Sequence, residues 1–253
     1  MAIYEVPFPE VDPVLPPFFP SDHGLQVVSH FQDLGPAYEH PPPLDLVSLG
    51  LTPPIATILN SVQQVSQLVP KWNSYPTAAT HLVMLTSMCT LLSHLLSLPP
   101  ITALSFPNPE SSASQISALV SESARFAICL HVITAWRGLP PDGTLTINHL
   151  MHQLIASLKA LMSTQGYSYN IILLWIVAVG GVSALNMPER GWFVSHLADM
   201  TEQMGIENWA DMKACISRGI WHERLVGKSH KKLWDEVEAK RKTFAMAEET
   251  LEV

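Results

Sequence analysis

The sequence predicts an all-α fold: a single helical domain of about eight helices around a buried central helix. Residues 171–182 form an apolar run with nothing more polar than glycine, and a helix that is apolar on every side must be enclosed by protein or lipid. From Thr52 onward, apolar residues recur at helical spacing between prolines and glycines. No stretch alternates polar and apolar residues over a length that would predict a strand.

The central run is shorter than the roughly 20 residues that cross a bilayer. We therefore expect a core helix and no membrane span. Gly180 and Gly181 each cost about 1 kcal/mol of helix propensity relative to alanine, which a closely approaching neighbouring backbone would offset. Asn186 and Pro188 are expected to end the helix. Arg190 then opens the next helix, where we expect it to pair with an acid of a neighbouring helix.

The other helices are expected between similar start and stop signals. Pro70 is expected to end the first, Pro99-Pro100 the second and Gly205 the sixth. On the second helix, Cys89 and Leu96 are placed on the buried side. The predicted helices cover about residues 52–69, 77–98, 108–136, 147–162, 171–185 and 190–204, one from a capping box at 208–211, and one after residue 227.

Residues 1–51 are predicted to be a Pro-rich, extended arm, followed by the helical domain at residues 52–253. The arm is acidic and aromatic, with no Lys or Arg before residue 71. Its prolines forbid long helices, and its aromatic content is high for a free tail. We expect it to lie on the body and cover apolar surface; an acidic interaction segment is the alternative.

The charge distribution limits the function. Charged residues make up 14% of the chain, against roughly 25% in an average soluble domain, so either uncharged polar residues cover the surface or much of it is an interface. The net charge of −8 argues against a nucleic-acid surface. Nine of the 14 basic residues follow residue 212, interleaved with acids, which predicts a salt-bridged helix face.

The cysteine pattern predicts a reducing compartment. Cys89, Cys129 and Cys215 are far apart inside apolar helical patterns, as expected of buried thiols rather than a disulfide framework. No secretory signal opens the chain. We therefore expect a nuclear or cytoplasmic location.

No motif predicts a catalytic, metal or cofactor site. The sequence lacks C-x-x-C, a phosphate-binding loop and a complete nucleophile elbow. His149 and His152 lie three apart on one helix with no acid as a third ligand, so a polar-face pair is the better interpretation. We expect no metal and no cofactor.

Three residues are candidates to line a ligand pocket, because helical bundles enclose small-molecule sites with few polar groups: His131, Arg137 and Trp175. Each also has a plainer interpretation. His131 and Trp175 fit simple core packing, and Arg137 fits a positive charge at the C-terminal end of a helix dipole.

A family resemblance rests on the order and spacing of residues in the second half of the chain. These are Leu174-Trp175, Gly180-Gly181, Glu189-Arg190-Gly191-Trp192-Phe193, Gly205-Ile206-x-x-Trp209, Trp221 and Leu233-Trp234-Asp235-Glu236-Val237. The chain resembles the fungal-specific transcription factor domain, the all-helical regulatory region that follows a Zn2Cys6 zinc-cluster motif. The resemblance makes Gly180, Gly181, Arg190, Trp192, Trp209 and Trp234 a structural signature.

The resemblance implies a non-catalytic regulatory domain that senses a ligand or contacts other proteins, as a homo-oligomer or with a transcriptional coregulator. The six cysteines of the zinc cluster have no counterpart in this chain. We therefore expect it not to bind DNA directly and to act through a partner. The alternatives are a cofactor-free isomerase- or cyclase-type enzyme or carrier of a fungal secondary-metabolite pathway on the same fold, and a purely structural adaptor.

Overall fold

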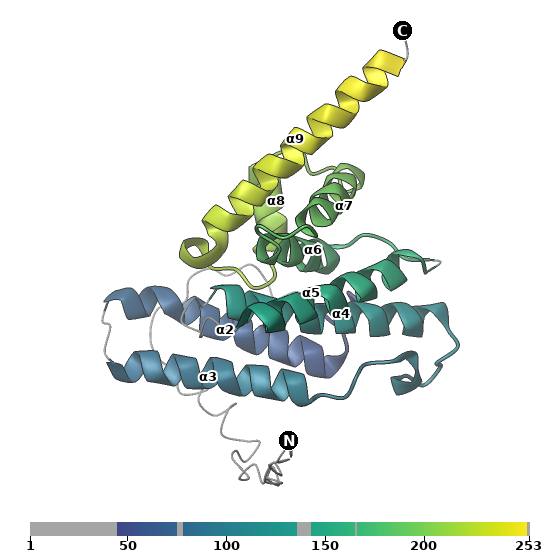
Figure 1. The fold of residues 1–253 in the computed structure, drawn as a ribbon. Coiled ribbons are helices and arrows are strands. Elements are labelled where there is room, and N and C mark those ends of the chain that lie inside the picture. The colour runs from purple at the N-terminus through teal and green to yellow at the C-terminus, as the bar shows by residue number, and fades with distance from the viewer. Residues whose placement is uncertain (1–44, 75–77, 136–142, 165, 252–253) are drawn as a thin grey trace, which may run out of the picture. The chain divides into compact units, whose positions relative to one another are not determined.

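The computed structural model describes residues 45–74, 78–135, 143–164 and 166–251, which form eight α-helices and no strand (Figure 1). The all-α prediction is thus confirmed. The helices, labelled as in Figure 1, are α2 (Pro53–Ser74), α3 (Ala78–Ser97), α4 (Ser112–Ala135), α5 (Gly143–Met162), α6 (Ile171–Ser183), α7 (Arg190–Gln203), α8 (Trp209–Ile216) and α9 (Lys228–Leu251). A 3-10 turn, η1 (Ala103–Ser105), precedes α4, and a π-helical turn, η2 (Glu223–Gly227), leads into α9.

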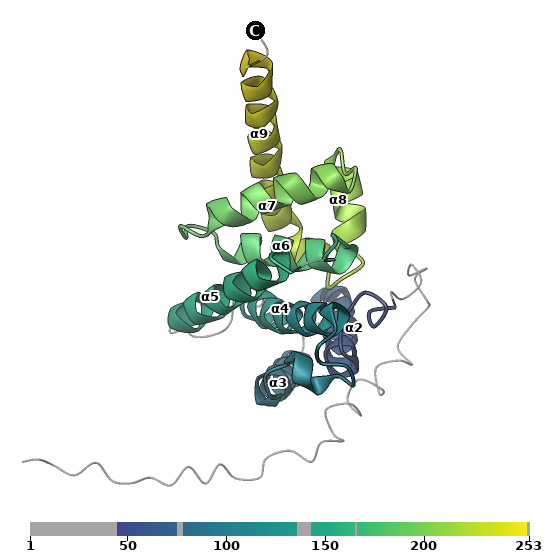
Figure 2. The same ribbon diagram turned by 90° about the vertical axis from the view of Figure 1, so that its right-hand side faces the viewer.

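Helix α6 is central, as the sequence predicts. It contacts α4, α5, α7, α8 and α9, and Figure 2 shows it between the α4–α5 pair and α7. Every residue from Ile172 to Gly181 is buried. Asn170 caps its N-terminus by accepting a hydrogen bond from Leu173 N at 2.9 Å. Just after the helix, Asn186 has a φ of 65°, in the left-handed region that asparagine tolerates well.

Gly180 and Gly181 let two other helices lie close to α6. A Cβ at Gly180 would stand 2.3 Å from Cε1 of Phe193 in α7. A Cβ at Gly181 would stand 2.8 Å from Cδ2 of Leu233 in α9. The close approach is therefore made by buried side chains, whereas the sequence suggested a neighbouring backbone.

Arg190 joins the same three helices. Its Nη1 donates to the carbonyl oxygen of Gly181 at 2.5 Å. Its Nε and Nη2 bind the two carboxylate oxygens of Glu236 in α9 at 2.7 and 2.9 Å. Such a two-pronged pair is the geometry in which arginine binds carboxylate most strongly. The predicted pairing of Arg190 with an acid of a neighbouring helix is confirmed.

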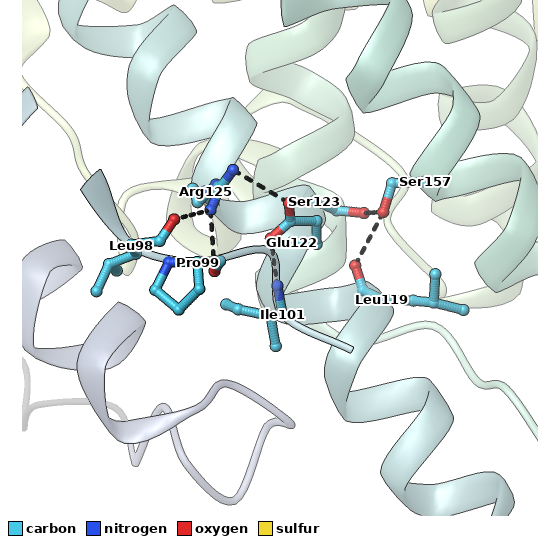
Figure 3. Close-up of polar contacts among 8 residues, drawn as sticks. All are labelled: Leu98, Pro99, Ile101, Leu119, Glu122, Ser123, Arg125 and Ser157. Carbon is cyan, nitrogen blue, oxygen red and sulfur yellow. Dashed lines mark hydrogen bonds and ion pairs between the residues drawn. The ribbon is translucent and has the colours of Figure 1, made fainter. Parts of the chain in front are cut away.

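The connection between α3 and α4 is held by polar side chains of α4 (Figure 3). Arg125 Nη1 donates to the carbonyl oxygens of Leu98 at 2.8 Å and Pro99 at 3.3 Å. Glu122 pairs with Arg125 and accepts from Ile101 N at 3.3 Å. The carbonyl oxygens of Leu98 and Pro99, just after the C-terminal end of α3, have no donor within that helix. Arg125 supplies one.

A buried hydroxyl pair joins α4 to α5 (Figure 3). Ser123 donates to the hydroxyl of Ser157 at 2.8 Å, and Ser157 donates to the carbonyl oxygen of Leu119 at 3.2 Å. Both hydroxyls are thereby satisfied in the interior, where an unpaired polar group is costly.

Three predicted helix limits were wrong. Helix α4 begins at Ser112 rather than at 108, because Ser111 accepts from Ser114 N and caps the first turn. Helix α5 begins at Gly143 rather than at 147; residues 144–146 contain no helix breaker. Helix α2 continues past Pro70 to Ser74, although a proline in a helix interior removes one backbone hydrogen bond.

The prediction of which α3 residues are buried was also wrong in part. Cys89 is exposed, and Leu96 is 60% exposed. Helix α3 packs on α2 and on α4, and Figure 2 shows it outermost in the stack of helices. Its sequence is apolar nearly all round, so spacing alone did not define the buried face. Of the other two thiols, Cys129 is buried and Cys215 is half-buried.

Most of the expected N-terminal arm lies outside the described residues. Its last seven residues, Asp45–Leu51, form turns against the body. Leu46 and Leu51 are buried, and the carbonyl of Leu49 accepts from the Asn170 side chain at 3.4 Å. This short part lies on the helical domain, and the prediction for the rest of the arm concerns residues outside the described ranges.

Alanine at Gly180 is expected to destabilise the fold by about 2 kcal/mol, because overpacking a fixed aromatic ring costs more than the helix propensity gained. Gly181→Ala should cost less, since the ends of Leu233 can turn away. Gly191→Ala is the matched control: nothing lies within 4 Å of its Cβ position in α7, so it should gain about 0.5–1 kcal/mol. Urea unfolding of the three variants tests the order, and equal stability of Gly180→Ala and Gly191→Ala would contradict it.

Candidate functional site

Two pairs of aromatic rings, from four parts of the chain, lie beside α6, and the two histidines are close enough to interact electrostatically. We call them the ring cluster: His131 of α4, Trp175 of α6, Trp221 of the α8–η2 connection and His230 of α9. The ring centroids of His131 and Trp175 are 6.2 Å apart, and those of Trp221 and His230 are 5.2 Å apart. His131, Trp175 and His230 are buried, and Trp221 is half-buried. The cluster therefore lies mostly inside the domain.

Trp175 is held by the chain that follows α8. Its Nε1 donates to the carbonyl oxygen of Ile220 at 3.3 Å. A Cβ at Gly219 would lie 2.6 Å from Cδ1 of the indole, so only glycine lets this backbone lie against the ring. The next residue in the chain is Trp221, which brings the third ring to His230.

Both histidines of the cluster are neutral at physiological pH. Burial, with a smaller contribution from nearby His230, lowers the pKa of His131 to about 3. Burial lowers the pKa of His230 to about 4, although its hydrogen bond to Val226 acts in the other direction. No carboxylate or cation among the described residues influences either pKa.

The tautomer of His230 follows from its backbone contact. Its Nδ1 lies 3.0 Å from the carbonyl oxygen of Val226, and a carbonyl oxygen only accepts. Nδ1 therefore carries the proton, and Nε2 of the neutral ring presents a lone pair. Within the described part of the chain, this buried Nε2 has no hydrogen-bond partner.

A second buried group without a partner lies one turn further along α9. The indole Nε1–H of Trp234 is a donor only, and no acceptor for it exists among the described residues. Trp234 is 1% exposed. A native interior rarely leaves such groups unpaired, so this region of α9 has unused hydrogen-bonding capacity.

The three predicted pocket residues have different outcomes. The structure brings His131 and Trp175 together, with His230 and Trp221 as neighbours that were not predicted for the site. Arg137 lies outside the described residues. His230 had no local signal, because it follows Lys228 and Ser229 and precedes two lysines, which suggested a solvated face.

The signature tryptophans occupy other positions around the second half of the fold. Trp192 lies against the ring of His196 at 4.0 Å between centroids. Trp209 is 6.4 Å from Trp221, next to the ring cluster. Trp209 is the first residue of α8, which is capped as predicted: Asn208 accepts from Asp211 N at 3.0 Å.

The remaining polar predictions concern the surface. His149 and His152 are both exposed, and His152 contacts Glu189 at 3.2 Å. Lys213 pairs with Glu223 at 2.7 Å, and Lys231 pairs with Asp235. Over the described ranges, no group of three His, Cys, Asp or Glu side chains is placed to hold a metal ion.

One described helix, α4, has the length and apolar character needed to cross a membrane. In its most apolar window, 61% of the residues are buried inside the protein. That burial is typical of a core helix.

The fold and the ring cluster define a class: an all-helical domain with an uncharged, buried aromatic centre. A family model of the fungal-specific transcription factor domain matches residues 15–247. The chain belongs to this family, which indicates a general regulatory role. No curated protein matches the chain significantly, and neither does any solved structure.

Acidification from pH 7 to pH 5 is expected to cost about 4 kcal/mol of stability through His131 and His230 alone. Their pKa values are lowered in the folded state, so below about pH 6.5 the unfolded chain binds more protons. Urea unfolding at both pH values measures the loss. Replacing both residues by phenylalanine should remove most of it, whereas His196→Phe should not; an unchanged pH dependence in the double variant would contradict the assignment.

Proposed function

We propose that the chain is a non-catalytic, ligand-responsive regulatory domain that acts on transcription in the nucleus through a partner protein. Family membership supports the regulatory part. The ligand-responsive part rests on one observation, the ring cluster with its unpaired acceptor at His230 Nε2. Arg137, which closely follows α4 in the chain, is a further proposed contact of the ligand.

The position of the cluster explains how occupancy would alter the domain. Its four rings come from α4, α6, the α8–η2 connection and α9, so a bound molecule contacts segments far apart in sequence. A molecule that binds one arrangement of these helices better than another shifts their equilibrium by its difference in affinity. If the arrangements differ in how they contact the partner protein, this shift makes the regulatory effect depend on the ligand.

The chain tethered to a heterologous DNA-binding module is expected to change the output of a fungal reporter gene. His131→Phe and His230→Phe should change that effect at least threefold while the helical circular dichroism is retained, because both alter the cluster's polar atoms. His196→Phe, in α7 and outside the cluster, is the control. Reporter output equal to that of the module alone, or equal output from wild type and cluster variants, would contradict the proposal.

A second mode of action is favoured by the outer surface of α3. No charged residue occurs in this helix, and Leu96 and nearby Leu104 of η1 are 60% and 83% exposed. Depletion of charge is typical of the core of a protein interface. We propose that a second copy of the chain binds here, with α3 antiparallel to α3.

This arrangement predicts a disulfide between two copies. Cys89 is exposed near the middle of α3, so a twofold axis through an antiparallel helix pair brings the two Cys89 thiols together. Mild oxidation should give a covalent dimer that Cys89→Ser abolishes. Light scattering should show Leu96→Glu to be monomeric, whereas Leu145→Glu, at a still more exposed position on α5, remains dimeric. A wild-type monomer at high concentration would exclude this mode.

A further inference from the structure

We propose that Thr243 of α9 is a phosphorylation site for a protein kinase that recognises basic residues. The inference goes beyond the proposed function, because it concerns another part of the fold and needs no ligand at the ring cluster. Three observations carry it: the sequence before Thr243, the exposure of its hydroxyl, and the position of this segment at the edge of the packed body.

The sequence before Thr243 is basic. Lys240, Arg241 and Lys242 directly precede it. No other serine or threonine of the sequence has Lys or Arg at both the second and the third position before it. Kinases select their substrates by charge pattern, and carboxylates of a kinase cleft bind Lys and Arg side chains through charge-assisted hydrogen bonds. The pattern therefore indicates a kinase of the class that binds basic substrates.

The hydroxyl of Thr243 is accessible. The residue is exposed, and its Oγ1 donates to the carbonyl oxygen of Ala239, one turn earlier in the same helix, at 2.9 Å. Breaking this bond leaves no buried group unpaired, because water reaches both atoms at an exposed site, and the cost is therefore small. The hydroxyl can thus turn toward an incoming phosphoryl group.

The segment around Thr243 lies where α9 leaves the body. Arg241 is the last residue of α9 whose described side chain bonds to another element: its Nη1 donates to the carbonyl oxygen of Ile206 at 2.9 Å. The helix then continues to Leu251, away from the other helices (Figures 1 and 2). Helical turns without packing are marginal in water, and chain ends open first. The turn around Thr243 can therefore open to enter a kinase cleft without disturbing the core.

The reaction is a phosphoryl transfer from ATP, which the kinase supplies with Mg²⁺. Oγ1 of Thr243 attacks the γ-phosphorus, and a new O–P bond forms while the bond from that phosphorus to the bridging oxygen of ADP breaks. The hydroxyl proton passes to the catalytic aspartate of the kinase, and ADP leaves.

The phosphate changes the charge of this part of α9. Lys240, Arg241 and Lys242 together carry three positive charges, and a phosphothreonine adds about −1.5 to −2 at pH 7. The stretch 240–243 thus falls from three positive charges to about one. Phosphorylation therefore removes most of the electrostatic attraction that this surface has for an acidic partner.

The test incubates the full chain with ATP, Mg²⁺ and the catalytic subunit of the cyclic-AMP-dependent protein kinase, and peptide mass spectrometry locates the phosphate. We expect it at Thr243. Thr57 of α2 is the matched control within the chain. It is also exposed, and its Oγ1 also donates to the carbonyl oxygen four residues earlier at 2.9 Å, but no Lys or Arg precedes it in the sequence. Thr57 should stay unmodified.

Variants separate recognition from accessibility. Thr243→Ala should abolish incorporation of phosphate. Lys240→Ala should lower the initial rate at least tenfold, because it removes the charge three positions before the hydroxyl. Lys242→Ala removes the same charge at the adjacent position and should change the rate less than threefold. A variant that loosened the helix would be phosphorylated faster, so a lower rate reports recognition.

Four results would overturn the proposal: no phosphate at Thr243, equal phosphorylation of Thr57, equal rates for Lys240→Ala and Lys242→Ala, or no phosphate at Thr243 in the chain isolated from a fungal host.

Discussion

Helices α7 and α9 reach the centre of the domain because two successive positions of α6 have no side chain. Phe193 occupies the space over Gly180, and Leu233 the space over Gly181. This packing removes water from the last turn of α6, where backbone carbonyls need new partners. Arg190 donates to one of them and also binds Glu236. The charge pair and the apolar contacts between the three helices thus depend on the same glycine pair.

Helix α9 connects that contact to the ring cluster. Leu233 packs on Gly181, while His230, less than one turn earlier, belongs to the cluster. A rigid helix moves as a unit, so a displacement at His230 also acts on Leu233 and on Glu236. The π-helical turn η2 immediately precedes this segment, and such turns occur frequently at functional sites. A displacement of α9 at the cluster would therefore also act on its packing against α6 and α7.

Much of the fold could be predicted from the sequence because α6 allows only one environment. A run that is apolar on all sides has to be enclosed, and Asn186 and Pro188 indicate where it ends. The cap at Asn170 was not predicted. The exposed face of α3 could not be predicted, since its apolar residues cover nearly the whole circumference. For the site, His131 and Trp175 stood out as polar or aromatic residues in apolar helices. His230 did not, because its burial depends on segments distant from it in sequence, such as α6 and the connection that carries Trp221, which no local pattern reveals.

The uncharged helix α3 has a consequence for how partners meet this protein. Its hydroxyls at Thr90 and Ser97 are bonded to the helix's own carbonyl oxygens, so they add little polarity to the outer surface. Electrostatic attraction between charged groups acts over roughly 8 Å at physiological ionic strength. Helix α3 has no Asp, Glu, Lys or Arg that could take part in it. The proposed docking at α3 would therefore be driven by desolvation, so its affinity should depend little on ionic screening and should weaken on cooling. On a chain with a net charge of −8, the proposed α3 interface would let two acidic copies meet without opposing like charges.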